Sequence, residues 1–239
     1  MTTPSYRKAL RALLTPAEHR VLAKLDTPQK IQTYLDRLPA NFELDGDTIM
    51  SPRRTLRARL AHCADGSLLA AAAMAFHGRE AWLMDLRSLP SDFDHVIVLF
   101  KERGLWGAIS KTNHAILRWR DPIYRSYREL AMSYAHEYCL PGGKKSLISY
   151  SKPFSLARYA PKRWVIEEED ELYWLMDALD EWPHIPVAPP AAMRNRRRTS
   201  KVELLSQEIV EWPDPRPKKK KKKKNSTAKA PPVRAKARR

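Results

Sequence analysis

Cys63 and His95 are the residues whose types and positions could support nucleophilic chemistry. Cys63 precedes "ADGSLLAAAAMAF", a run of strong helix formers, so we expect its sulfur at a helix N-terminus. Unpaired N–H groups and the helix dipole favour the thiolate there. His95 opens "HVIVLF", an expected central strand, and a histidine at a strand mouth can meet a helix packed on that sheet. The two together predict a thiol nucleophile with an imidazole base.

Each of these residues also has a plain structural explanation. A free cysteine packs as a small apolar side chain, and a single histidine is commonly a hydrogen-bonded loop residue. The order of the two elements, a cysteine helix followed by a histidine strand, is what favours the chemical interpretation.

The first third of the chain is expected to be helical and to position the cysteine helix. Thr15-Pro16, Thr27-Pro28 and Ser51-Pro52 each pair a capping hydroxyl with a proline suited to the first helical turn. We therefore predict short helices over four ranges: 5–13, 16–25, 28–37 and 52–60.

A meander of strands is expected after Gly78. The stretches 80–88 and 94–102 are rich in β-favouring residues, and "GLWGAIS" and "HAILRWR" are each expected to add one strand. Asp121-Pro122 is expected to open a helix that runs to Leu140, and a further helix lies within 167–182. This order predicts an α+β fold with an antiparallel sheet.

Two stretches carry a resemblance to a known family. "TLRARLAHCADGSLLAAAAMAFHGREAWLMDL" and "DHVIVLFKERGLWGAIS" resemble the core of the transglutaminase-like cysteine enzymes, over about residues 30–122. The resemblance implies a papain-like cysteine core, in which a Cys-bearing helix packs on a small antiparallel sheet flanked by helices. It also implies that Cys63 forms a thioester and that His95 transfers the proton.

The third member of the family's catalytic set is an acid at the end of the next strand, where this sequence has Ser110. A serine can hydrogen-bond an imidazole but lacks the full charge that stabilises imidazolium. Asn113 is the favoured alternative for orienting His95. Asp121 is another, although its position before a proline also explains it as a helix cap. Catalytic candidates are thus Cys63, His95 and Asn113.

The remaining reactive side chains have simpler interpretations. His114 is a second choice of base, Asp65 suits a first helical turn, and Cys139 is expected to be structural. No metal-ligand spacing such as Cys-x-x-Cys and no phosphate-binding glycine motif occurs in the sequence. We therefore expect no metal and no cofactor.

Charge divides the chain into two parts. Of 44 Lys and Arg residues, 18 lie from Arg194 onward, with only 4 of the 27 Asp and Glu, so most of the net charge of +17 lies there. We expect one globular domain over 1–187 and a disordered basic tail over 188–239, with an isolated helix within 201–212. Such a tail favours nonspecific contact with nucleic acid or another polyanion.

Cysteine content and hydropathy bear on the compartment. Two cysteines argue against a disulfide framework, and the N-terminal sequence has no apolar run suited to export. The most apolar stretch, "GSLLAAAAMAF", is too short to span a bilayer. We expect a cytoplasmic protein without a transmembrane segment.

Two functions are therefore expected as alternatives. The first is cysteine-dependent acyl transfer, or hydrolysis of an amide or peptide, through a thioester on Cys63. The second is a catalytically degenerate binding or scaffold protein whose basic tail contacts nucleic acid or another polyanion, which Ser110 in place of the acid favours. The substrate, the acyl acceptor and the oligomeric state do not follow from the sequence.

Overall fold

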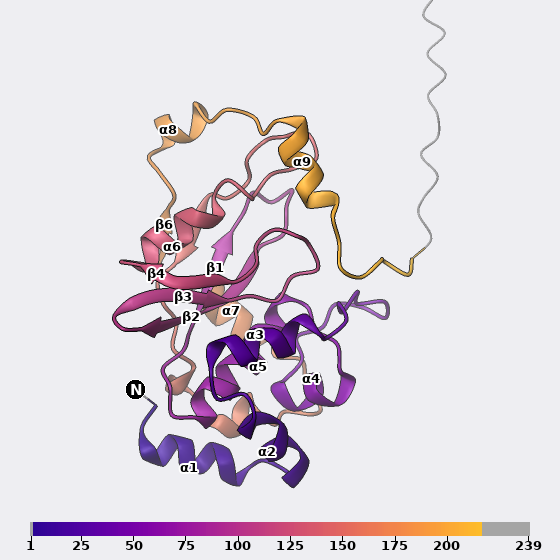
Figure 1. Cartoon of the computed structure of the whole chain (residues 1–239), viewed down its shortest axis with the longest axis vertical. Helices are drawn as coiled ribbons and strands as arrows, with labels where there is room; N and C mark the ends of the chain where they lie inside the picture. The colour runs from indigo at the N-terminus through magenta and orange to yellow at the C-terminus, as the bar shows by residue number, and fades with distance from the viewer. Residues whose placement is uncertain (1, 217–239) are drawn as a thin grey trace, which may run out of the picture.

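One antiparallel sheet organises residues 2–216, the part of the chain that the computed structural model describes (Figure 1). Its strand order is β4-β3-β2-β1-β5-β6, and every neighbouring pair runs antiparallel. The strands are β1 (Trp82–Arg87), β2 (His95–Glu102), β3 (Leu105–Ile109), β4 (Arg120–Tyr124), β5 (Ser149–Ser151) and β6 (His184–Pro186). The predicted α+β class is confirmed.

The N-terminal helices begin where the capping pattern predicted. Each has a proline in its first turn, and each N-cap hydroxyl accepts a hydrogen bond from a backbone N–H of that turn. Thr3 extends the same pattern to one further helix. The helices are α1 (Pro4–Ala12), α2 (Pro16–Ala23), α3 (Pro28–Asp36) and α4 (Pro52–Ala58).

Helix α5 (Cys63–Phe76) is the centre of the main core. Every residue from Ala64 to Phe76 is buried, because α1, α2, α3 and α4 cover the helix on one side and β2 lies on the other. A helix that is apolar all round fits only such a site. Gly66 allows α5 to lie against Lys111, since a Cβ at position 66 would lie only 2.5 Å from the Cβ of Lys111.

Side chains of β2 alternate between the two faces of the sheet. Val96, Val98 and Phe100 pack toward α5, whereas Ile97 and Leu99 pack against a second core. That second core is completed by α6 (Tyr127–Tyr134). The sheet therefore lies between a thick helical layer and a thin one (Figure 1).

Two predicted elements around residue 120 are wrong. "HAILRWR" is mostly loop, and the fourth strand comes later, over Arg120–Tyr124. Asp121-Pro122 lies inside this strand, where proline is tolerated because β4 is at the edge of the sheet and one side of its backbone needs no partner. Helix α6 starts only at Tyr127, capped by Ser126.

The predicted start of disorder at residue 188 is also wrong. After α7 (Tyr173–Asp180) and β6, the chain forms α8 (Pro190–Arg194) and α9 (Lys201–Glu208). Arg196 anchors this part by donating to the carbonyls of Leu147 and Lys145. Residues 217–239, with seven consecutive lysines, lie outside the described residues. Within residues 2–216, no helix has the length and apolarity needed to cross a membrane.

Candidate active site

Cys63 is the first residue of α5, as predicted, and its side chain is partly exposed. The segment 39–41 runs beside the residues before it, through a parallel bridge between Ala40 and Ala61. Cys63 is thus the partly exposed first residue of a helix whose other residues are all buried.

His95 reaches Cys63 from the sheet. It is the first residue of β2, is 6% exposed, and lies close enough to the Cys63 sulfur to lower the pKa of the thiol. The structure thus brings together the two residues that the sequence paired.

Ser110 occupies the position next to His95. It directly follows the last residue of β3, next to the start of the antiparallel strand β2. Its Oγ lies 2.8 Å from Nε2 of His95. The same hydroxyl donates to the carbonyl of Leu117 at 2.5 Å. Since the hydroxyl hydrogen is used there, Ser110 accepts from Nε2–H, which leaves Nδ1 of His95 for the sulfur.

Ser110 is itself held by Gln32 of α3. The Gln32 amide accepts from the Ser110 backbone N–H at 2.9 Å and donates to the Ser110 carbonyl at 2.8 Å. Ser110 is only 2% exposed, and such a paired contact fixes its backbone. Gln32 of α3 therefore holds Ser110 in place, and Ser110 in turn orients the imidazole of His95.

Asn113 does not reach His95, which corrects the expectation that it orients the ring. Its amide donates to the carbonyl of Trp212 at 2.9 Å and accepts from the Trp212 N–H at 2.8 Å. Asp121 is also elsewhere, because its carboxylate accepts from the indole N–H of Trp119. Of the three residues considered for this position, the structure brings only Ser110 to the imidazole.

His62 is a second imidazole at the sulfur, and the sequence analysis missed it. It is the N-cap of α5, where Nδ1 lies 3.1 Å from the backbone nitrogen of Ala64 and Nε2 donates to the carbonyl of Thr48 at 2.6 Å. Burial opposes a charge on this ring, but the adjacent Cys63 sulfur and the nearby Asp65 outweigh burial and raise the pKa of His62 to about 10. A histidine directly before a helix-opening cysteine was the available signal.

Asp65 holds this end of the helix together. It is fully buried and accepts from the backbone N–H groups of Met50 and His62 and from the amide of Asn41. Burial raises the pKa of Asp65, although the charge of His62 and these hydrogen bonds oppose the rise. The predicted place in the first turn is confirmed, and the carboxyl also supports the ring beside the sulfur.

The electrostatics of the site favour the thiolate. Burial raises the pKa of Cys63, but the imidazoles of His62 and His95 beside the sulfur outweigh burial and hold that pKa well below its usual value. The sulfur is thus activated by two imidazoles rather than one.

The other reactive side chains considered from the sequence lie outside this group. His114 binds the carbonyl of Gln207 through Nδ1, in an exposed position. Cys139 is buried and accepts from the side chain of Gln207, in line with its predicted structural role. Lys111 is buried beside α5 and donates to the carbonyl of Leu38, and burial lowers its pKa.

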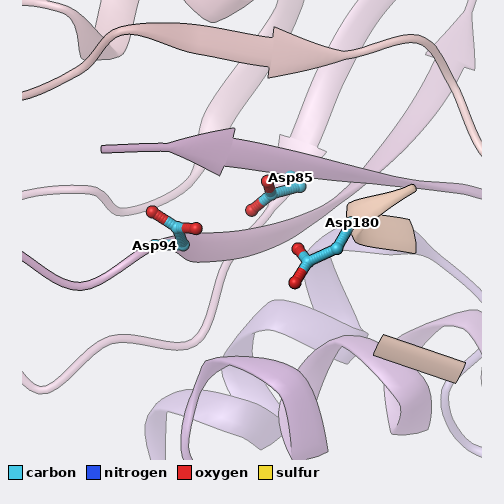
Figure 2. A group of neighbouring side chains, drawn as sticks. All are labelled: Asp85, Asp94 and Asp180. Atoms are coloured by element: carbon cyan, nitrogen blue, oxygen red, sulfur yellow. The ribbon is translucent and has the colours of Figure 1, made fainter. Parts of the chain in front are cut away.

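Three carboxylates gather at a different place, where Asp85 on β1, Asp94 just before β2 and Asp180 at the end of α7 point toward one another (Figure 2). The protein supplies its own partners for these carboxylates. Nε2 of His184 lies 3.0 Å from Asp85, and the Arg87 guanidinium lies 3.7 Å from Asp85 and 3.5 Å from Asp180. We assign no metal to this group.

No family model matches this sequence, and no curated protein matches it. Geometry and charge are therefore the basis for assigning chemistry to the group formed by Cys63, His62, His95 and Ser110.

Proposed function

We propose that the protein is a cysteine-dependent enzyme of the transglutaminase-like kind, which transfers or hydrolyses the acyl group of an amide or peptide. The observation that carries the proposal is that His95 lies beside the Cys63 sulfur and is hydrogen-bonded to Ser110, and that the pKa of the sulfur is well below its usual value. A thiolate at a helix N-terminus beside an oriented imidazole is the arrangement that nucleophilic catalysis by cysteine requires.

The reaction follows from these positions. The Cys63 thiolate attacks the amide carbonyl carbon, and a protonated Nδ1 of His95 gives its proton to the leaving nitrogen as the C–N bond breaks. A thioester on Cys63 remains. Neutral His95 then takes a proton from water or from an amine, which attacks the thioester carbonyl, and the sulfur leaves as the thiolate.

Ser110 is uncharged, and this limits the rate of the proposed reaction. Its neutral hydroxyl fixes the tautomer and orientation of His95, which is the positioning part of the role an acid plays in such sets. It gives the imidazolium no compensating negative charge. We expect a working site whose turnover is slower than that of a site with a carboxylate in place of Ser110.

The alternative function is a binding protein that keeps this fold without turnover. The neutral Ser110 favours it, and so does the positive charge from Arg194 onward, which would carry the contact with a polyanion. The two functions differ in what they require of Cys63: an enzyme must form an acyl-thiol adduct, whereas a scaffold has no such need.

The test uses p-nitrophenyl acetate as a generic acyl donor and intact-mass detection of the acyl-enzyme. All proteins carry Cys139→Ser, so that Cys63 is the only thiol, and His95→Ala is compared with Cys63→Ala. We expect an acetyl adduct on Cys63 that forms rapidly and depends on His95. If the adduct forms as slowly as on a free thiol, with or without His95, the enzymatic function is ruled out.

A further inference from the structure

Helix α9 and the residues after it expose a row of aliphatic side chains. Val202 is 73% exposed, Leu205 is 55% exposed and Ile209 is 61% exposed. Val202 and Leu205 are three residues apart on α9, and Ile209 is the first residue after this helix. We call these three residues the aliphatic row.

The exposure does not come from a helix that stands away from the body. The other side of this segment is bonded to the loop that follows β3: the N–H of Ala115 donates to the carbonyl of Ile209, and the N–H of Glu211 to that of Asn113. Gln207 donates to the carbonyl of Glu137. The segment is thus fixed with its aliphatic row facing solvent.

Positive charges border the aliphatic row. Arg197 and Arg198 are exposed just before α9, and Lys201 is exposed as its first residue. Bonds from Arg198 and Thr199 to the carbonyls of Gly142 and Gly143 place Lys144 on the neighbouring turn. In the sequence, seven consecutive lysines begin at position 218, shortly after the described residues end. Cations therefore precede and follow the aliphatic row along the chain.

The acidic residues of the same segment are largely engaged by the protein. Glu203 accepts from the backbone N–H of Ser200 in the capping box of α9, and Glu211 pairs with Arg118 at 3.0 Å. Glu208 is exposed. The charge that this surface offers to a partner is therefore mainly positive.

From these observations we infer that the aliphatic row and its bordering cations form a docking surface for an anionic phospholipid bilayer. Lipid headgroups supply the negative charge that complements the cations, and the acyl boundary takes up apolar side chains. Neither the positive charge nor the apolar side chains alone would give stable anchoring to a bilayer, but the two together do.

The aliphatic row is what separates a bilayer from nucleic acid as the occupant. A phosphodiester backbone offers nothing to Val202, Leu205 or Ile209, and single-stranded nucleic acid is held mainly by stacking on aromatic rings. The one aromatic residue from position 201 to 216 is Trp212, which is half-buried and has its indole nitrogen covered. In Figure 1, α9 lies at the end of the molecule opposite α1 and α2.

The test measures sedimentation of the full chain with phosphatidylcholine vesicles, with and without phosphatidylglycerol. The triple variant Val202→Ser, Leu205→Ser and Ile209→Ser is compared with Ile123→Ser, an aliphatic residue of β4 that is 64% exposed. Leu205→Ser alone serves if the triple variant unfolds. We expect binding only to the anionic vesicles, roughly tenfold weaker for the triple variant and unchanged for Ile123→Ser.

Two results would overturn the inference. One is absence of binding to the anionic vesicles at low salt. The other is equal binding of the unmodified and triple-variant chains, because the lysines alone would then account for it. A duplex DNA competitor that displaces both chains equally would, together with that second result, identify a simple polyanion contact.

Discussion

Ser110 and His95 are joined by a hydrogen bond whose direction is fixed, with 2.8 Å between Oγ and Nε2. The Ser110 hydroxyl cannot donate to the ring, since it already donates to the carbonyl of Leu117. The neutral imidazole must therefore carry its hydrogen on Nε2. This places the free electron pair on Nδ1, the nitrogen that serves the sulfur of Cys63.

Replacing Ser110 by Ala removes this control. We expect Ser110→Ala to lower the acylation rate of Cys63 by about 10- to 100-fold, the usual cost of losing a group that orients a catalytic histidine. Ser155→Ala is the matched control, because the Ser155 hydroxyl accepts from the N–H of Ala157 rather than contacting a group of the site. Acylation kinetics with p-nitrophenyl acetate measure the effect. Equal loss in both variants would contradict the assigned role.

Ser110→Asp tests the same position in the other direction. A carboxylate there would stabilise the imidazolium that forms during acyl transfer, so we expect the His95 side of the pH–rate profile to shift to higher pH. The profile of acylation rate against pH measures this. A profile identical to that of the unmodified protein would show that Ser110 is not electrically coupled to the ring.

Removing His62 should weaken the thiolate. His62→Asn places a good helix-capping side chain at the N-cap of α5 but removes the charge beside the sulfur. Because that charge holds the pKa of Cys63 down, its loss raises the pKa, and the rise of alkylation rate with pH moves to higher pH. Iodoacetamide kinetics on chains with Cys139→Ser measure the shift. An unmoved profile would leave His62 a purely structural cap.

Gly66 is required because α5 approaches Lys111 closely, in the segment that follows β3. Alanine is favoured over glycine in a helix by about 1 kcal/mol, yet its Cβ would lie 2.5 Å from the Cβ of Lys111, which cannot swing away. We expect Gly66→Ala to lower the free energy of unfolding by about 1–3 kcal/mol, as overpacking does. Urea unfolding measures this. Gly142→Ala, whose nearest neighbour is 3.9 Å away, is the control and should change stability by less than about 0.5 kcal/mol.

The sequence predicted the elements that carry strong local signals. Threonine or serine before proline marked the N-terminal helices, because capping and fixed φ are decided within one turn. The stretch "HAILRWR" was wrongly predicted as a strand because its structure depends on contacts distant in sequence. Leu117 supplies a carbonyl to Ser110, and the strand that pairs with β3 comes later. Asp121-Pro122 carried the same capping pattern but lies in an edge strand.

The site was predicted in its first two members and missed in the others. Cys63 and His95 are each marked by the element they begin. Ser110 was seen at the right position but ranked below Asn113, because residue type alone favours an amide. Only the spatial arrangement shows that Asn113 is occupied by Trp212 and that Gln32, distant in sequence, holds Ser110.

The pairing of Asn113 with Trp212 determines where the chain can be shortened. A chain cut at residue 188 or 194 would lose Trp212 and Glu211, and with them the partners of Asn113 and Arg118 in the loop that carries Leu117. Altered reactivity in such a chain would reflect a loosened loop beside the imidazole rather than the missing lysines. Removing the lysine run alone requires an end after Arg216, so that Glu211 and Trp212 continue to hold the loop in place.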